Sequence, residues 1–115
     1  MAFLAKGNKI TMDVYDYGIQ LPFDVTGTVF DLTDKMRFEL KKSKDSETLI
    51  SRDYLNELDS TSKFRFFLEL TKEEAALISP GNYIYFVKYL KKIDGVDKVQ
   101  NTIASDLFKV KNGNG

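Results

Sequence analysis

The chain has 115 residues, of which 43% are hydrophobic and 30% charged, proportions typical of one globular domain rather than a disordered chain. Seventeen basic residues balance seventeen acidic ones, so the chain lacks the excess positive charge of a nucleic-acid-binding domain. It contains no Cys and no His, which excludes disulfides, zinc–thiolate sites and Ser-His-Asp triads. Only carboxylate, Lys or Tyr chemistry remains open to an enzyme.

The first ten residues contain a short apolar run, 2–5, followed by Lys6 and Gly7. A secretory signal has a basic region followed by a longer apolar run, and a membrane span has about 20 apolar residues. The sequence therefore predicts a protein that is made in the cytoplasm and has no membrane partner.

Apolar and polar residues alternate over most of the chain, the pattern of half-buried β-strands. The first two predicted strands cover residues 10–14 and 19–25. Residues 16–18 between them indicate a kink that moves the chain from one sheet to the other. Pro22 lacks a backbone N–H, which places the second strand at a sheet edge or makes this residue a strand start.

The middle of the chain predicts a third strand over 36–41 and a loop over 41–47. Leu49 and Ile50 fit a short strand, whereas residues 54–58 are compatible with either a strand or a helical turn. After a loop at 59–62, residues 64–70 place alternate apolar side chains on one face. Phe67 indicates that the other face is also partly covered.

Thr71 and Glu74 match a capping box, and they predict a short helix that ends at Ser-Pro-Gly, 79–81. Residues 82–90 are the most apolar run, which favours a central strand. Asp94-Gly95 predicts a hairpin turn into a last strand over 98–110.

These elements predict an all-β, immunoglobulin-like antiparallel β-sandwich of about seven strands with one short helix. A single domain would cover residues 1–110, and residues 111–115 would form a disordered tail. The period-two positions of the strongest strands predict five core residues: Phe38, Phe66, Leu68, Tyr85 and Val87.

Two sets of carboxylates have the residue types of a metal or catalytic site. Oxygen ligands in loops can hold calcium, but the acidic group lacks EF-hand spacing, which favours a solvated surface. A glycosidase needs two carboxylates across a cleft, and in the second set Glu74 already has a capping role. The sequence thus predicts no catalytic, cofactor-binding or metal-binding residue and no cofactor. The acidic group is Asp13, Asp16, Asp24, Asp31 and Asp34, and the second set is Glu69, Glu73 and Glu74.

Two further groups have the residue types of a binding surface. Aromatic rings can stack on sugars or bases, but a shared face of a central strand favours core packing. That applies to Tyr83, Tyr85 and Tyr89, whereas Tyr15 and Tyr17 at the kink are better candidates for ligand contact. A basic run interleaved with acids is typical of a soluble surface rather than a nucleic-acid site. The run is Lys35, Arg37, Lys41, Lys42 and Lys44.

The segment from Thr71 to Tyr85 places a capped turn and Pro-Gly-x-Tyr-x-Tyr before a strand, which is similar to the tyrosine corner of immunoglobulin-like domains. Residues 8–110 as a whole resemble the N-terminal domain of phage baseplate upper proteins and related phage tail proteins. Shared features are the kinked first strand, the Pro-containing second strand, Met36-Arg-Phe-Glu-Leu40 and the final Phe108-Lys-Val110. This chain differs in having no long helix or fibre after residue 110.

The resemblance implies a non-enzymatic connector of phage tail or baseplate parts, made in the host cytoplasm and located in the virion. Its expected partners are other tail or baseplate proteins. The alternative is a β-sandwich module that binds carbohydrate or a cell surface through loop Asp and Tyr residues. Because 103–110 contains no Pro, we expect this strand to pair with another chain or with a second copy, whereas Pro22 protects the other edge.

Overall fold

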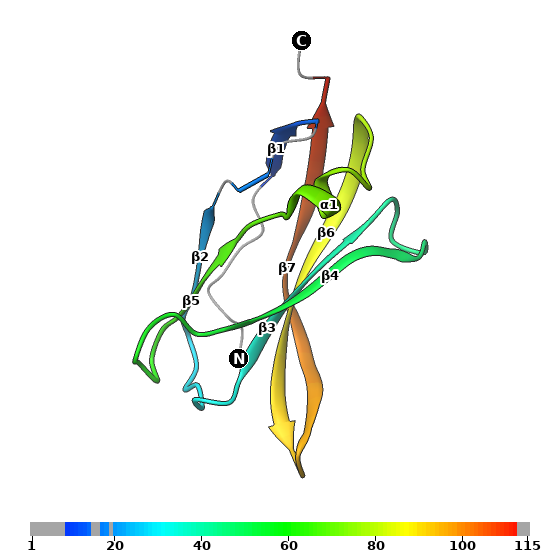
Figure 1. The fold of residues 1–115 in the computed structure, drawn as a ribbon. Coiled ribbons are helices and arrows are strands. Elements are labelled where there is room, and N and C mark those ends of the chain that lie inside the picture. The colour runs from blue at the N-terminus through cyan, green and yellow to red at the C-terminus, as the bar shows by residue number, and fades with distance from the viewer. Residues whose placement is uncertain (1–8, 15–16, 19, 113–115) are drawn as a thin grey trace.

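The computed structural model describes residues 9–14, 17–18 and 20–112. These residues form seven strands in two sheets and one short helix, which confirms the predicted all-β sandwich (Figure 1). The larger sheet has the strand order β1-β7-β6-β3-β4, and the smaller sheet pairs β2 with β5. In chain order the elements are β1 Ile10–Asp13, β2 Leu21–Val25, β3 Lys35–Lys41, β4 Thr48–Leu55, β5 Phe64–Leu68, α1 Lys72–Ala75, β6 Gly81–Ile93 and β7 Val96–Lys111.

The first and last strands run parallel, from Ile10 opposite Phe108 to Asp13 opposite Lys111, whereas every other strand pair is antiparallel. The prediction of an antiparallel sandwich is therefore wrong for this one pair. Parallel neighbours need a long crossover connection. Here all the other strands lie between β1 and β7 in the sequence, so local alternation cannot reveal the pairing.

The chain changes sheet between β1 and β2, as the kink predicted, although residues 15–16 and 19 lie outside the described residues. Pro22 is in β2, which pairs with β5 alone, so its expected place at a sheet edge is confirmed. Phe67 lies opposite Pro22 and is half-buried, as expected for a strand covered in part on both faces.

β4 settles the region that the sequence left ambiguous. Residues 48–55 form one continuous strand, because they pair with β3. Lys35 lies opposite Leu55 at one end of this pairing, and Leu40 lies opposite Ile50 near the other. Tyr54 turns inward and stacks on Phe66 with ring centroids 4.9 Å apart. Leu58 lies in the following loop.

One apolar core joins the two sheets, and all five predicted core residues are buried in it. Phe23 of β2 stacks on Phe66 of β5 at 5.0 Å and meets Tyr85 of β6 edge-to-face at 6.3 Å. Phe38 of β3 also stacks on Tyr85, with ring centroids 5.9 Å apart. Aromatic rings therefore connect the small sheet to the centre of the large one.

The segment between β5 and β6 has the predicted local geometry. The Thr71 hydroxyl accepts a hydrogen bond from Glu74 N at 3.1 Å, and Glu74 Oε1 accepts one from Thr71 N at 2.9 Å. Helix α1 ends at Ala75, three residues earlier than the apolar run to Ile78 suggested. None of the helices in the described part of the chain is long and apolar enough to cross a membrane.

Tyr83 closes a tyrosine corner. Its hydroxyl donates to Ser79 O at 2.8 Å and accepts from Ser79 N at 3.1 Å, so it ties the start of β6 to the turn before it. A Tyr near the start of the penultimate strand that binds backbone a few residues upstream is a hallmark of immunoglobulin-like sandwiches. The corner and the strand order together confirm the predicted fold class.

The β6–β7 hairpin extends beyond the rest of the sandwich (Figure 1). β3 pairs with β6 only as far as Leu90, and β6 and β7 then continue together to Ile93 opposite Val96. Asp94 and Gly95 have φ values of 53° and 79°, as a type I′ turn requires. β7 ends at Lys111, and residues 113–115 of the predicted tail lie outside the described residues.

Candidate interaction surface

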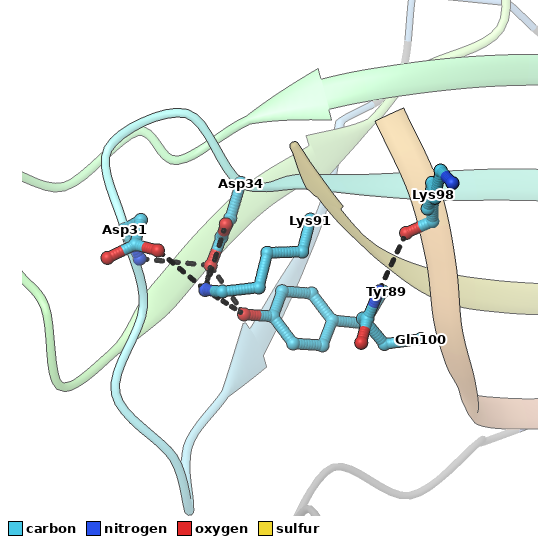
Figure 2. A network of polar contacts seen from close by, with 6 residues as sticks. All are labelled: Asp31, Asp34, Tyr89, Lys91, Lys98 and Gln100. Carbon is cyan, nitrogen blue, oxygen red and sulfur yellow. Dashed lines mark hydrogen bonds and ion pairs between the residues drawn. The ribbon is translucent and has the colours of Figure 1, made fainter. Parts of the chain in front are cut away.

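Four side chains form a polar network where the β6–β7 hairpin leaves the sandwich (Figure 2). Asp34 is only 1% exposed, and its Oδ2 accepts hydrogen bonds from Tyr89 Oη at 2.5 Å and from Asp31 N at 2.9 Å. Lys91 Nζ lies 2.6 Å from Asp31 Oδ2 and 3.4 Å from Asp34 Oδ2. The network therefore fastens the 26–34 loop to the inner face of β6.

The environment of this network favours the protonated forms of Tyr89 and Lys91. Burial, reinforced by the hydrogen bond to the Asp34 carboxylate, raises the pKa of Tyr89 to about 12. The hydrogen bond to Asp31 raises the pKa of Lys91 against the opposing effect of burial. A phenol and an ammonium that hold their protons this firmly act as hydrogen-bond donors, not as bases or nucleophiles, at neutral pH.

Asp34 corrects the prediction that the acidic group is solvated surface. The other described members are exposed: Asp13 and Asp24 on strands, and Asp31 beside the turn. Asp16 lies outside the described residues. Asp34 is buried because Tyr89, the Asp31 backbone and Lys91 supply the donors that a buried carboxylate needs. Within the described ranges, no three acidic residues are grouped so that they could hold a metal ion.

The three glutamates considered for catalysis have local contacts. Glu74 completes the capping box and forms an ion pair with Arg52 at 3.2 Å. Glu69 Oε1 accepts a hydrogen bond from Gln20 Nε2 at 3.0 Å. Glu73 is exposed in the first turn of α1.

The tyrosine and lysine groups occupy the expected surroundings. Tyr83, Tyr85 and Tyr89 are buried on the inner face of β6, which confirms core packing, whereas Tyr17 is 55% exposed and Tyr15 lies outside the described residues. The basic run lies among acids and rings. Its contacts are Lys35–Asp97 at 2.7 Å, Arg37–Asp53 at 2.7 Å, Lys41 above Phe86, and Lys42 above Tyr83, while Lys44 is exposed in the loop.

The sandwich is closed along the side where β4 leads into β5. Asn56 Oδ1 accepts a hydrogen bond from Arg65 N at 2.8 Å, and Glu57 N donates to Arg65 O at 2.8 Å. Arg52 reaches across from β4 to Glu69 O at 3.2 Å. Residues 52–57 therefore hydrogen-bond the backbone at Arg65 in β5 and at Glu69 just after it.

The opposite side, between β2 and the β1–β7 edge, carries a groove of about 430 Å³. The groove reaches the core at Val25 and Val87, and Leu21, Ile103 and Ala104 contribute further apolar surface. A smaller hollow of about 90 Å³ shares Ile10, Thr11 and Leu21 with the groove and extends to Tyr17. Apolar concavities of this kind are typical binding surfaces. We call this the open side.

The outer edge of β7 lies along the open side. β1 covers it only from Phe108 to Lys111, and no other strand formed by residues 9–14, 17–18 and 20–112 pairs with it. Two side chains cap backbone groups locally: Gln100 Nε2 donates to Lys98 O at 3.3 Å, and Asp106 Oδ1 accepts from Leu107 N at 2.6 Å (Figure 2 shows the first). Irregularities in the pairing with β6 leave Gln100 and Ile103 without a cross-strand partner.

Sequence reasoning missed the groove and the buried network. The groove combines residues from β1, β2, β6 and β7, whose proximity depends on the sheet order. Asp34 had a partial signal, since an acid directly before a strong strand and after a turn has local hydrogen-bonding roles. No family model matches the chain, and no curated protein matches it significantly.

Proposed function

We propose that this protein is a non-enzymatic structural and interaction module that connects parts of a phage tail or baseplate in the virion. The observation that carries the proposal is the open side, where an apolar groove of about 430 Å³ adjoins an uncovered strand edge. The assignment to a tail or baseplate rests on the resemblance of residues 8–110 to phage tail proteins.

An extended segment of a partner protein fits this surface best. A groove beside a free strand edge can take main-chain hydrogen bonds from the edge and a side chain into the groove, which is the mode of β-strand addition. Leu21 is 37% exposed and lines both hollows, so it lies where such a segment would pass. On the side of β4 and β5, residues 56–57 already bind the β5 backbone at Arg65.

Binding to the protein products of neighbouring genes tests this proposal. Leu21→Asp places a charge in the groove, and Leu77→Asp makes the same change at a residue that is 66% exposed and lines neither hollow. We expect a tail protein encoded beside this chain to bind the parent and the Leu77→Asp variant but not Leu21→Asp. Absence of binding to every neighbouring gene product, or equal loss in both variants, would contradict the proposal.

Tyr17 favours a second candidate, a module that binds carbohydrate or a cell surface. Its ring is 55% exposed and lines the smaller hollow, where it could stack on a sugar. A glycan array and purified cell walls are suitable probes. Binding that Tyr17→Ala abolishes and Leu77→Asp preserves would support this candidate over the connector.

A further inference from the structure

We propose that two copies of this chain associate through antiparallel pairing of their β7 edges, about a two-fold axis at Thr102. This pairing would join the two five-stranded sheets into one continuous sheet. The inference goes beyond the proposed function, since strand addition by a partner protein does not require self-association. Both would use the same uncovered edge of β7, so a partner segment and a second copy would compete for it.

The uncovered length of β7 restricts the register of such a pair. Among the described residues, β1 pairs with β7 from Phe108 onward, which leaves Val96 to Leu107 open. Antiparallel pairing of identical edges places one residue opposite its own copy on the two-fold axis. To use the whole open length, that residue has to lie at its middle, at Asn101 or Thr102.

Charge selects Thr102. With Thr102 on the axis, Lys98 of each copy lies opposite Asp106 of the other, so the dimer contains two pairs of opposite charge. With Asn101 on the axis, Lys98 would instead face Ala104. Opposite charges directly across antiparallel strands are stabilising.

The side chains of Lys98 and Asp106 project on the same face, as a cross-strand pair requires. Lys98 lies opposite Lys91 of β6, and Asp106 lies opposite Tyr85. The odd-numbered side chains of β6 from 83 to 89 face the core, so Tyr85 and Lys91 project on the same face of the sheet. Residues directly opposite each other share a face, which places Lys98 and Asp106 on that face as well. Neither Lys98 nor Asp106 has an ion-pair partner within the described part of its own chain. A second copy supplies the missing partner for both.

The local caps make the association reversible. In one copy, Gln100 and Asp106 hydrogen-bond the backbone at Lys98 O and Leu107 N, which protects the free edge. In the dimer the partner backbone replaces these bonds. Because bonds are exchanged rather than added, most of the net gain comes from the two charge pairs and the apolar surface near Ile103. We therefore expect a weak dimer.

Charge exchange between the two positions gives the decisive experiment. Lys98→Asp places Asp opposite Asp106, and Asp106→Lys places Lys opposite Lys98, so each variant alone should lose about tenfold or more in dimer affinity. An equimolar mixture of the two variants has opposite charges at both pairs and should form a heterodimer. Lys44→Asp makes the same charge change in an exposed loop and should dimerise like the parent.

Sedimentation equilibrium from about 1 µM to about 1 mM covers the dissociation constants of weak complexes. Cysteine substitution checks the register, because the chain has no cysteine of its own. In the proposed dimer Thr102→Cys faces its own copy, whereas Ser105→Cys faces Val99. The Thr102→Cys variant should therefore oxidise to a disulfide-linked dimer faster than Ser105→Cys. A parent that stays monomeric throughout, or a mixture that does not associate more strongly than either variant alone, overturns the proposal. Retained binding of a neighbouring gene product by a monomeric parent would leave the proposed function intact.

Discussion

Asp34 is the residue on which the contacts at the root of the hairpin converge. Its carboxylate is buried, yet it accepts hydrogen bonds from a phenol, a backbone amide and an ammonium group. Removing one partner of a buried charge costs more than the interaction itself contributes, because the remaining charge stays desolvated. The network therefore holds the loop and the hairpin in one arrangement beside the core.

Alkaline titration should report this network. The unfolded chain releases the Tyr89 proton near pH 10, whereas the folded protein holds it to about pH 12. The stabilisation is therefore complete below pH 10 and is lost as the pH rises toward 12. We expect the free energy of unfolding, from urea titrations at several pH values, to fall more steeply in the parent than in Tyr89→Phe. Parallel pH profiles for the two proteins would contradict this expectation.

Thr71→Ala should reduce the free energy of unfolding by about 1 kcal/mol. The substitution removes the acceptor of the Glu74 N–H, which then has no helical partner in the first turn. Urea midpoints measure the effect, and Thr71→Ser, which keeps the hydroxyl, should behave like the parent. An unchanged midpoint for Thr71→Ala would show that water replaces the cap at no cost.

These residues differ in how visible they are in the sequence. Thr71 and Glu74 are three residues apart and follow a local rule, so the capping box could be predicted. Tyr89 lies 55 positions after Asp34 and Lys91 lies 57 positions after it, so the burial of Asp34 could not be predicted. The role of a polar residue can be predicted from sequence where its hydrogen-bond partners are close in the chain. It cannot be predicted where the fold brings together partners that are distant in the chain.

The same distinction holds for whole elements. The β6–β7 hairpin was predictable, because Asp94-Gly95 specifies the turn and follows the most apolar run of the chain. β4 was only half predicted, since its partner strand β3 decides where it ends. β1 could be predicted as a strand, but its parallel neighbour could not, because that neighbour lies at the far end of the chain.

Gly95→Ala should destabilise the hairpin by about 1 kcal/mol or slightly more. Gly95 has φ +79°, a left-handed conformation that costs a residue with Cβ about 1–2 kcal/mol. A Cβ there would meet no atom within 4 Å, so the cost is conformational and not steric. Urea denaturation measures it, and Asp94→Asn, which keeps a preferred I′ residue, is the matched control. Equal stability of Gly95→Ala and the parent would mean that the turn adopts another geometry.

At the scale of the molecule, the two long sides of the sandwich differ. On the side of β4 and β5, side chains and backbone of residues 52–57 bind across the gap between the sheets. On the side of β2 and β7, the gap remains as a groove. The sandwich class followed from the alternation of the strands, but this asymmetry arises from the order of strands in the sheets.

The sequence predicted that the final strand pairs with another chain over residues 103–110, but β1 covers the end of that range, and the uncovered part of β7 runs from Val96 to Leu107. Val110 is buried and lies between Met12 of β1 and Gly81 of β6. The part of β7 that is open to pairing ends at Leu107, because β1 pairs with β7 from Phe108 onward.

The two sheets should unfold in one cooperative transition. A two-stranded sheet is marginal by itself, and β2 and β5 depend on the large sheet through the stacked rings of Phe23, Phe66 and Tyr54. Far-ultraviolet circular dichroism follows both sheets, and tyrosine fluorescence follows the core, since the chain has no Trp. We expect the two signals to give the same urea midpoint. Phe66→Leu in the small sheet and Phe38→Leu in the large one should each shift both signals together, because either change leaves a void in the shared core. If Phe66→Leu lowered the fluorescence midpoint and left the dichroism midpoint unchanged, the small sheet would unfold independently and the single-core description would be wrong.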